Sequence, residues 1–431
     1  MSRLFPAVLR ALLLALSLAV LAPLSAAAAD NVTLTFWTFL DPKKSGPREK
    51  AWAEIIDAFE KKNPGITIRT EVFPWKEISP KLIVASASGR GPDVTMVETD
   101  LAEKLARGKI LEPLDRYIAA SDPKLRDDTY HPETRIFDGQ TYSLNVWTNG
   151  SALFYRKDLF EKANLKPPST LDEFVAAAKK LTVDVNGDGR IDQWGFAEGT
   201  ARSQPFAHRT VFPLIWAQGG SVVSPDGKAV FNSPAGVKAV QWFVDLVKVH
   251  KVMPPDIVNL TYDERLQGFM AGKYAMVIEG LHRYQSTQAS PVVKGKVGLA
   301  YIPSWDGKKA APTPVTGWDI GIGANSKQKD AAWKFVMHAM SYESQLTNAK
   351  VADAVPARRS VAKDAYFQTP HAAEMKFILD YLAQGSQEFP RAKNLDRLID
   401  LFNQAINEAI IKDVPVKVAL DQAAAKYNQA D

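Results

Sequence analysis

The order of strand and helix patterns between residues 32 and 97 constrains the fold more than any other feature. Apolar residues alternate with other residues over 32–37 and again over 66–72, which is the period of a strand. Between them, residues 52–59 carry apolar side chains at i, i+3, i+4 and i+7, as one face of a helix does. A helical pattern over 78–88 and a short apolar strand over 93–97 follow. The chain therefore begins with a βαβαβ order.

This order predicts a mostly parallel sheet that is covered by helices on both faces. In such a sheet the ligand lies beyond the carboxyl ends of the strands. Those ends fall at 37–41, 72–75 and 98–100. We therefore expect a ligand-binding surface to include these three segments.

Residues 139–149 form an extended stretch rich in Gly, Thr, Asn and Trp, which predicts a crossover between two lobes. The alternation then starts again, with a strand over 152–155 and helices over 171–181 and 237–249. The region 328–431 is mostly helical in pattern. The sequence thus predicts a second α/β lobe, with late helices packing on both lobes.

Length and composition agree with this organisation. The chain has 431 residues, of which 46% are hydrophobic and 23% charged, so it is a globular protein of two or three domains. The formal net charge of +5 is small, and no run of five basic residues occurs. We therefore expect no nucleic-acid partner.

The first 29 residues predict a cleaved secretory signal. Arg3 and Arg10 supply the basic end, 11–21 form an apolar run too short to span a bilayer, and 25–29 offer an Ala-x-Ala cleavage site. The chain contains no cysteine, which excludes disulfides and an N-terminal lipidated cysteine. A secreted chain without an anchor needs an outer membrane to retain it, so we expect the periplasm of a Gram-negative bacterium.

Motifs for several enzyme classes are missing. The sequence has no Gly-x-Ser-x-Gly elbow, no phosphate-binding glycine loop and no His-Glu-x-x-His pair. A glycosidase remains an alternative at this stage, because a pair of carboxylates could converge in space. The candidates for that pair are Glu98, Asp100, Glu198, Glu279 and Asp319. A binding protein would use the same carboxylates as acceptors for sugar hydroxyls, and we favour that interpretation.

One loop resembles the front of a calcium-binding loop. Asp184, Asn186, Asp188 and Asp192 occupy relative positions 1, 3, 5 and 9, with glycine at position 6. Gly195 stands at position 12, where a bidentate glutamate would complete the site. A metal-free turn stabilised by Asx and glycine residues is the favoured alternative, and a structural calcium ion is the only cofactor that the sequence suggests.

Tryptophans gather beside turns and at the expected strand ends. An indole stacks on the C–H face of a sugar, while neighbouring carboxylates and amides bind its hydroxyls. For any one tryptophan, packing in the interior is the commoner role. The tryptophans in these positions are Trp37, Trp75, Trp147, Trp194, Trp216, Trp305 and Trp318.

Several stretches, in their order and spacing, resemble the periplasmic solute-binding proteins of ATP-binding-cassette (ABC) sugar importers, the group that contains maltose-binding and glycerol-3-phosphate-binding proteins. The resemblance covers nearly the whole chain after the signal. The stretches are Phe36-Trp37, Gly91-Pro92-Asp93-Val94, residues 152–160, 167–174 and 269–276, and Gly317-Trp318-Asp319-Ile320. Arg156 and Leu171 depart from the family pattern, which commonly has asparagine and tryptophan there.

The resemblance implies an α/β, two-lobe periplasmic binding protein fold of type II-like architecture, in which the ligand lies between lobes joined by hinge crossovers. By this likeness the first lobe comprises 30–148 plus 305–342, and the second comprises 149–304 plus 343–431. The implied function is capture of a sugar or sugar-like polyol, without catalysis. The implied partners are the transmembrane permease subunits of an ABC transporter and its cytoplasmic ATPase, and the protein is expected to act as a monomer.

The resemblance also implies which residues contact the ligand. From the first lobe and the crossover these are Trp37, Thr38, Trp75, Glu98, Asp100, Tyr142, Asn145 and Trp147. Further along the chain they are Trp216, Glu279, His282, Arg283, Gly317, Trp318, Asp319 and Arg358. An alternative within the same class is an anionic ligand, a phosphorylated or sulfonated polyol, for which Arg283, Arg358 and His282 would form a clamp.

Overall fold

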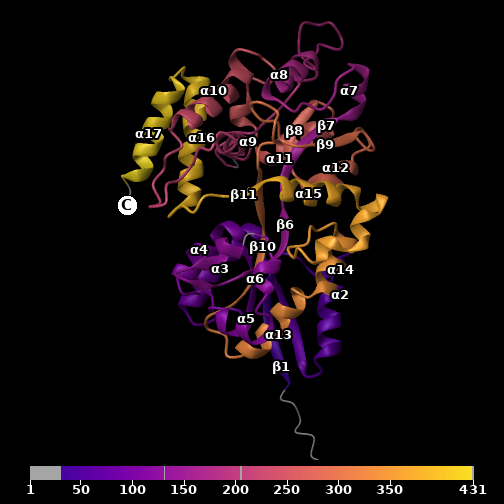
Figure 1. Cartoon of the computed structure of the whole chain (residues 1–431), viewed down its shortest axis with the longest axis vertical. Helices are drawn as coiled ribbons and strands as arrows, with labels where there is room; N and C mark the ends of the chain where they lie inside the picture. The colour runs from indigo at the N-terminus through magenta and orange to yellow at the C-terminus, as the bar shows by residue number, and fades with distance from the viewer. Residues whose placement is uncertain (1–30, 131, 204–205, 430–431) are drawn as a thin grey trace, which may run out of the picture.

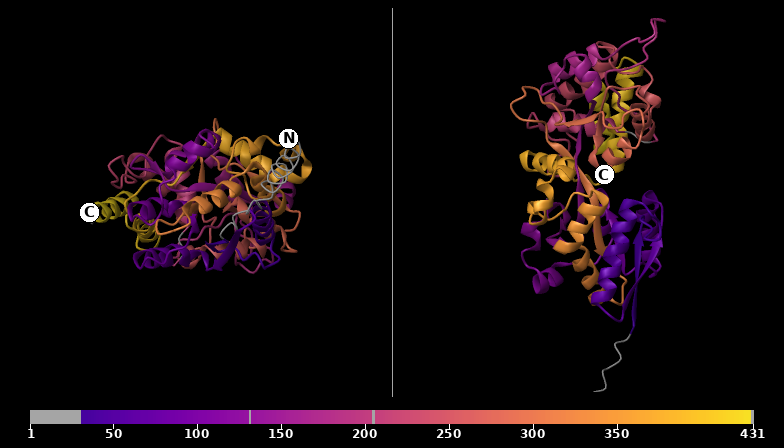
Figure 2. Two further views of the ribbon diagram at one scale, coloured as in Figure 1. Left: turned by 90° about the horizontal axis from the view of Figure 1, so that it is seen from below. Right: turned by 90° about the vertical axis from the view of Figure 1, so that its right-hand side faces the viewer.

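The computed structural model describes residues 31–130, 132–203 and 206–429, and shows two lobes, one above the other (Figure 1). The predicted signal, 1–29, lies outside the described residues. Strands β6 (Leu144–Asn149) and β10 (Thr313–Ile322) run from one lobe towards the other, and helix α15 (Ala373–Gln384) lies between the lobes (Figures 1 and 2). The predicted α/β two-lobe fold is confirmed. Within the described part of the chain, no helix is both long and apolar enough to cross a membrane.

The first lobe is built on a six-stranded sheet in the order β11-β10-β3-β1-β2, with β6 also paired to β10. Strand β1 is parallel to β2 and β3, as the βαβαβ order predicts, whereas β10 runs antiparallel to both β3 and β6. The strands are β1 (Val32–Thr38), β2 (Ile66–Val72), β3 (Val94–Glu98), β6 (Leu144–Asn149), β10 (Thr313–Ile322) and β11 (Ser386–Glu388).

Alternation along β1 explains why the sheet is covered on both faces. Leu34 and Phe36 belong to the apolar core that includes Trp52 of α2, whereas Trp37 belongs to the core on the other face, with Leu82 of α3. The helices of this lobe are α2 (Pro47–Lys62), α3 (Trp75–Ala87), α4 (Ala102–Arg107), α5 (Asp115–Ser121), α6 (Leu125–Asp128), α13 (Lys329–Ala339) and α14 (Tyr342–Ala352). A small hairpin of β4 (Ile136–Phe137) and β5 (Gln140–Thr141) precedes β6.

The structure moves both boundaries of the predicted segment 305–342, because Trp305 donates to the carbonyl of Leu214 in the second lobe at 3.0 Å and packs against the core of that lobe. Helix α14 packs against α2 of the first lobe, and Gln345 donates to the carbonyl of Val146 at 2.7 Å. The first lobe therefore extends past residue 342, where the sequence analysis ended it. The pairing that holds α14 there lies almost two hundred residues away along the chain, so no local pattern reveals it.

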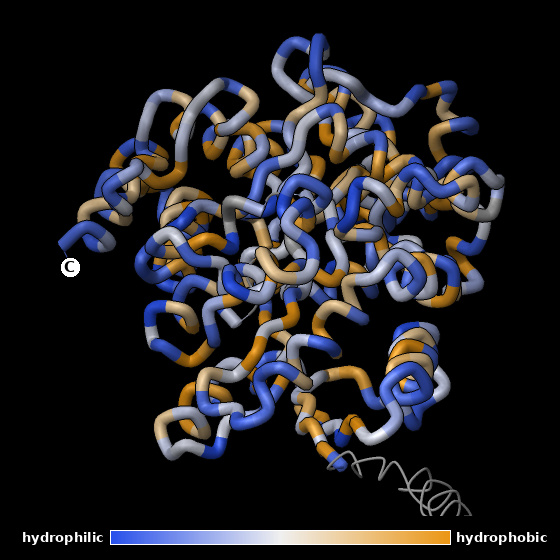
Figure 3. The backbone as a smooth tube through the Cα atoms, turned by 60° about the horizontal axis from the view of Figure 1, so that its bottom comes forward, coloured by the Kyte–Doolittle hydropathy of each residue, from blue (hydrophilic) through white to orange (hydrophobic). Residues whose placement is uncertain are grey.

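The second lobe has a three-stranded sheet in the order β8-β7-β9, in which both neighbours run antiparallel to β7. Its strands are β7 (Ser151–Arg156), β8 (Met276–Gly280) and β9 (Val297–Ala300). Its helices are α7 (Lys157–Lys162), α8 (Leu171–Lys180), α9 (Ala207–Trp216), α10 (Pro234–Lys248), α11 (Tyr262–Met270), α12 (Tyr284–Gln288), α16 (Leu395–Ile411) and α17 (Val416–Asn428), and α15 (Ala373–Gln384) joins it at the junction. Along these helices hydrophobic and hydrophilic residues alternate, as expected where one face lies on a core (Figure 3).

The two lobes meet where β6 leaves the first sheet and β7 enters the second. Strand β6 ends at Asn149, β7 begins at Ser151, and the carbonyl of Gly150 between them accepts a hydrogen bond from the backbone of Leu281 at 3.0 Å. The Thr313 hydroxyl of β10 also donates to the carbonyl of Ser151 at 2.8 Å. The extended crossover that the sequence predicts over 139–149 is thus confirmed as the route between the lobes.

Candidate functional site

The side of the first lobe that faces the second carries an aromatic group. The rings of Phe39 and Trp318 lie with centroids 4.3 Å apart, and Trp147 lies 6.2 Å from Phe39. Trp318 and Trp147 are register partners on β10 and β6. Trp318 is partly exposed, whereas Trp147 is buried against Trp52, so Trp318 and Phe39 present the accessible part of this group.

Two carboxylates lie beside this aromatic group, at the end of β3. Glu98 is the register partner of Trp318, and Asp100 follows in the next turn. Among the described residues neither side chain has a hydrogen bond or an ion pair, and both are partly buried. Two carboxylates without partners in a partly buried surface are free to accept bonds from a ligand.

Electrostatic interactions show that these carboxylates face the second lobe. The pKa of Glu98 is raised to about 7, mainly by burial and then by the charge of Asp100, while Arg209 of the second lobe lowers it. Burial likewise raises the pKa of Asp100 to about 6, against the opposing effect of Arg209. Arg209 lies on α9 and its guanidinium stacks on Phe389 and Phe206, at 4.7 and 5.4 Å from the ring centroids.

The second lobe contributes an aromatic pair and a cationic segment. Phe206 and Tyr262 stack with centroids 4.4 Å apart. Arg283 donates to the hydroxyl of Tyr262 at 3.3 Å and to Asp263 at 3.0 Å. His282 beside it has an exposed side chain, yet the protein that surrounds it and the charges of Arg283, Arg48 and Arg209 lower its pKa. We call the facing surfaces of the two lobes, formed by these residues, the interlobe site.

Glu279, a predicted ligand contact, lies in the interior of the second lobe with no exposed surface. One of its oxygens accepts from Arg265 at 2.7 Å, and the other accepts from Tyr262 at 2.6 Å and from the backbone of Gly280 at 2.7 Å. Its carboxylate therefore positions Tyr262 and has little capacity left for a ligand.

Asp319 and Asn145, also predicted contacts, form the centre of a buried network at the β10–β6 pairing. Asp319 accepts bonds from Asn145 at 3.0 Å and from Ser143 at 2.7 Å, and it pairs with Arg135 at 3.2 Å. Gly317 is required there, because a Cβ at this position would lie 2.4 Å from the carbonyl oxygen of Trp147. These three positions shape the strand crossing that carries Trp318.

Two predicted contacts in the first lobe, Trp37 and Thr38, are engaged elsewhere. Trp37 is buried against Phe73 and donates its indole N–H to Glu71 at 2.7 Å. The buried Thr38 hydroxyl accepts from the backbone of Leu40 at 3.0 Å.

Arg358 binds Asp128 at 2.6 Å and Asp122 at 3.4 Å. The structure therefore holds Arg358 in the first lobe, and the predicted clamp does not include its guanidinium.

The other predicted contacts lie in varied surroundings. Trp75 begins α3 and is 48% exposed, with the Lys76 ammonium 5.1 Å from its ring. Tyr142 is partly buried beside Phe137, and Trp216 ends α9 against Phe389. Their contact with a ligand stays a prediction.

Sequence reasoning missed Phe39, Arg48, Arg209 and Tyr262. Phe39 was recoverable, because it lies in the loop at the end of the first strand, where ligands of such sheets bind. Arg48 was recoverable as well. It lies in the first turn of α2, where the helix dipole disfavours a positive charge, so an arginine at this position suggests a role other than helix stability. Arg209 and Tyr262 carry no such signal, because a charge or a tyrosine on a helix is ordinary on a solvated face.

The side chains of the loop over 184–192 bind its own backbone. Asp184 accepts from the amides of Gly187 and Gly189 at 2.7 and 2.8 Å, and Asp192 accepts from Val185 at 2.7 Å. In the part of the chain that the structure describes, no three His, Asp or Glu side chains gather closely enough to hold a metal ion. The calcium site stays a prediction.

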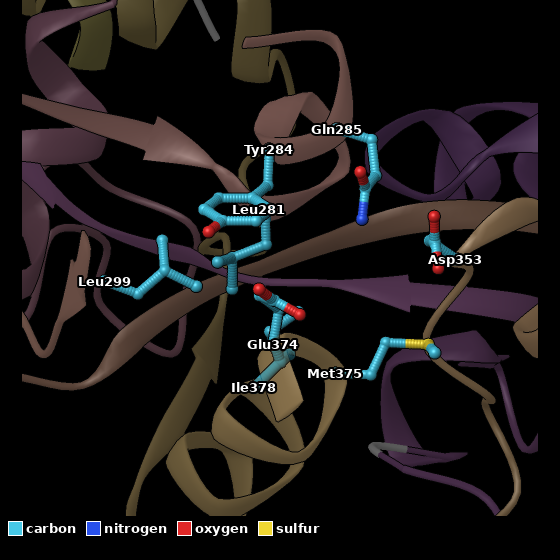
Figure 4. Close-up of a pocket in the computed structure, with 8 residues that line it drawn as sticks. All are labelled: Leu281, Tyr284, Gln285, Leu299, Asp353, Glu374, Met375 and Ile378. Atoms are coloured by element: carbon cyan, nitrogen blue, oxygen red, sulfur yellow. The ribbon is translucent and has the colours of Figure 1, made fainter. Parts of the chain in front are cut away.

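Two hollows lie outside the residues that form the interlobe site, and the first of them borders its His282–Arg283 segment. A cavity of about 20 Å³ lies between the Leu281–Tyr284 turn and α15, with Glu374 and Asp353 among its lining residues (Figure 4). It has room for about one water molecule, which is too small for a sugar. A shallow hollow of about 500 Å³ on the second lobe is lined mainly by residues 218–221 and 233–235. Neither contains a predicted site residue.

Comparison with known proteins agrees with this arrangement. Residues 44–346 match the model of the bacterial extracellular solute-binding protein family. The chain belongs to this family. A binding protein of Brucella abortus is 28% identical over 324 residues, which are 74% of each chain.

The arabinooligosaccharide-binding protein of Bacillus subtilis is 24% identical over 328 residues, covering 74% of this chain and 71% of the relative. Among solved structures, maltose-bound MalE3 of T. maritima superposes with a TM-score of 0.77 at 25% identity, covering 93% of this chain and all of that one. This extracellular solute-binding protein therefore shares its two-lobe arrangement with sugar-bound structures.

Proposed function

We propose that this extracellular solute-binding protein captures a sugar or sugar-like polyol in the periplasm and delivers it to the permease of an ABC transporter. The observation that carries the proposal is the pairing of an accessible aromatic surface, Phe39 and Trp318, with the unpartnered carboxylates Glu98 and Asp100. A sugar needs such a pair, because its C–H face stacks on a ring while its hydroxyls donate to carboxylates.

The second lobe completes this chemistry. The Arg209 guanidinium acts on the carboxylates through its charge, and it lies over the buried Phe206 ring, which stacks on Tyr262. A ligand held by groups of both lobes stabilises the form in which the lobes are closed, since only that form makes all the contacts. The permease then distinguishes the closed, loaded protein from the open one. Relatives named for binding an arabinooligosaccharide and a structure with maltose support this ligand class.

The protein is proposed to bind its ligand without cleaving it. Of the five carboxylates considered for a glycosidase, Glu198 and Glu279 are engaged with Arg265 in the interior and Asp319 is bound by Arg135. Glu98 and Asp100 remain, and a binding protein uses them as acceptors. Family membership supports the same conclusion.

Isothermal titration and tryptophan fluorescence of the protein without residues 1–29 would test the proposal. The panel contains neutral mono-, di- and oligosaccharides, sugar alcohols and their anionic derivatives. We expect saturable binding of one ligand class, with the ligand recovered chemically intact by chromatography, and a higher melting temperature by the linkage of binding to folding. Cleaved ligand, or no binding across the panel, would contradict the proposal.

A further inference from the structure

Arg48 occupies a position that the stability of its own helix does not explain. It lies in the first turn of α2, where the helix dipole disfavours a positive charge. Its side chain is exposed, and its guanidinium lies 5.8 Å from the centroid of Phe39 in the aromatic group of the interlobe site. Among the described residues it has no ion pair. An unpaired cation therefore borders the surface on which we place the sugar ring.

A second cationic segment, His282–Arg283, borders the same region from the second lobe. The backbone of the preceding residue, Leu281, is bound to Gly150 at the junction of the lobes. His282 folds back over the end of β8, and this requires Gly280, because a Cβ there would lie 2.6 Å from the Cε1 atom of His282. Arg283 uses Nε for Tyr262 and the terminal nitrogen Nη2 for Asp263, and its other terminal nitrogen, Nη1, has no hydrogen bond to any residue that the structure describes.

The charges of these two cationic groups act on each other across the junction. Trp147, which contacts Phe39 in the Arg48 region, lies on β6, three residues before Gly150. Although the Arg48 side chain reaches solvent, the protein packed around it lowers its pKa, the neighbouring Glu49 raises it, and the like charge of Arg283 lowers it. Two guanidiniums that repel each other from opposite lobes oppose closure, unless an anion lies between them.

We propose that the ligand carries an anionic group, a carboxylate, phosphate or sulfonate on the sugar or polyol, and that Arg48 and Arg283 bind this group from opposite lobes beside His282. The inference rests on the proposed function and specifies its ligand class. Guanidinium groups bind such oxyanions through charge-assisted hydrogen bonds with two parallel donors. The anion cancels the repulsion, so the anionic ligand both occupies the site and favours closure.

The carboxylates at the end of β3 determine the orientation of the bound ligand. Glu98 and Asp100 repel an anion and accept bonds from hydroxyl groups, so they receive the hydroxyl-bearing part of the ligand. Arg209 is attracted to these two carboxylates and therefore adds little to the anion site. The neutral ring of the ligand then stacks on Phe39 and Trp318, between the two charged ends of the interlobe site.

A matched ligand series tests the inference. Glucose, glucuronate, glucose 6-phosphate and sulfoquinovose share a ring and differ at carbon 6, which distinguishes the neutral, carboxylate, phosphate and sulfonate classes. The same comparison is made for each neutral ligand of the wider panel and its acid or phosphate. We expect one anionic class to bind at least about tenfold more tightly than its neutral counterpart, as one charge-assisted contact provides.

Variants identify the residues. Arg48→Met keeps the contact with Phe39 but removes the charge, and it should weaken binding of the anionic ligand at least about tenfold while changing that of the neutral sugar less than about twofold. Arg48→Lys should recover part of the loss. Arg283→Met should match Arg48→Met. Arg116→Met, an exposed arginine on α5 in the first lobe, is the control and should have no effect.

Equal affinity for neutral and anionic ligands, with no effect of Arg48→Met, would overturn this inference and leave the proposed function intact. An equal loss of neutral and anionic ligand in Arg48→Met would also overturn it, because the role of Arg48 would then be structural. Absence of binding by every member of the panel would overturn the proposed function, and the inference with it.

Discussion

Arg265 and Glu279 form an ion pair of 2.7 Å in the interior of the second lobe, and neither side chain has any exposed surface. A second carboxylate, Glu198, lies 3.3 Å from the same guanidinium. The set holds Tyr262 through the bond between its hydroxyl and Glu279. The buried charges thus connect the core of the lobe to the interlobe site.

Removing the cation of this set should strongly destabilise the protein. Arg265→Met would leave two carboxylates buried without a counter-charge, which costs about 3–5 kcal/mol of unfolding free energy. Urea unfolding followed by circular dichroism measures this loss. Arg202→Met, an exposed arginine whose closest carboxylate is 3.7 Å away, is the control. A loss below about 1 kcal/mol for Arg265→Met would contradict the role assigned to the set.

Trp37 should matter for stability and not for binding. Trp37→Phe removes the indole N–H that Glu71 accepts and part of a buried ring, so we expect a loss of about 1–2 kcal/mol in unfolding free energy. The dissociation constant of the ligand should stay within about twofold of the wild-type value. Calorimetric titration distinguishes a structural role from ligand contact. A tenfold weaker affinity of Trp37→Phe for the ligand would show that Trp37 contacts the ligand.

Trp318 should have the opposite profile. Trp318→Ala removes the partly exposed ring that lies against Phe39, and we expect the ligand to bind about ten- to a hundredfold more weakly, as for an aromatic anchor at an interface. The fluorescence change on binding should shrink at the same time. Trp305→Ala, a tryptophan of the second lobe that donates to Leu214, should preserve both signals. If Trp318→Ala binds the ligand with unchanged affinity, the ligand does not stack on Trp318 and this part of the proposal is wrong.

The contribution of Glu98 to the stability of the folded protein should fall as the pH rises towards neutrality. The pKa of Glu98 is raised from its ordinary 4.5 to about 7, so the folded state binds more protons than the unfolded state between these values. This contribution is complete below pH 4.5 and is lost as the pH rises through about 7. The Glu98→Gln variant should therefore become more stable than the wild type as the pH rises. We expect a difference of about 1 kcal/mol in unfolding free energy at pH 8, which is less than the full pKa shift implies, because solvent screens the partly exposed carboxylate.

Thermal melts of both proteins from pH 4.5 to pH 8 provide the measurement. Asp100→Asn should behave in the same way with a lower midpoint, since the pKa of Asp100 is raised to about 6. If the difference in melting temperature between Glu98→Gln and the wild type does not change with pH, the pKa of Glu98 is not raised in the folded protein.

Gly317 should tolerate no side chain. Gly317→Ala places a Cβ 2.4 Å from the carbonyl oxygen of Trp147, which forces β6 and β10 apart, and overpacking of this kind costs about 1–3 kcal/mol. Chemical unfolding gives the value. Gly91→Ala is the matched control, because its Cβ would approach only the Ser86 hydroxyl, at 3.1 Å. Equal stability of the two variants would mean that the strand crossing relaxes freely.

The parts of the fold that depend on local patterns were predictable. Helix α16 (Leu395–Ile411) lies in the region 328–431 that the sequence predicts to be mostly helical, and the early strands and helices follow the predicted order. Long-range pairing was not predictable, because its partners are far apart along the chain. Strand β10 lies between β3 and β11, and Gln345 of α14 reaches β6, yet nothing in either segment marks these neighbours.

The residues of the candidate site likewise fall into those that a local sequence pattern reveals and those that depend on contacts far apart along the chain. Trp318 and Glu98 were recognisable because loops and strand ends of α/β sheets carry ligands, and they lie at the interlobe site. The burial of Glu279 was not recognisable, since it follows from Arg265 on α11, whose position in three dimensions the sequence does not reveal. A carboxylate at the end of a strand has the same sequence pattern whether it faces solvent or a buried guanidinium.

Strand β10 has a consequence for how the protein is made. The sheet of the first lobe needs residues 313–322 between strands that end before residue 150, so the first third of the chain leaves the ribosome long before its own sheet can close. Such distant contacts slow folding. The nascent chain therefore stays open while most of its length is synthesised, and this is the form in which a polypeptide can be threaded through a narrow channel.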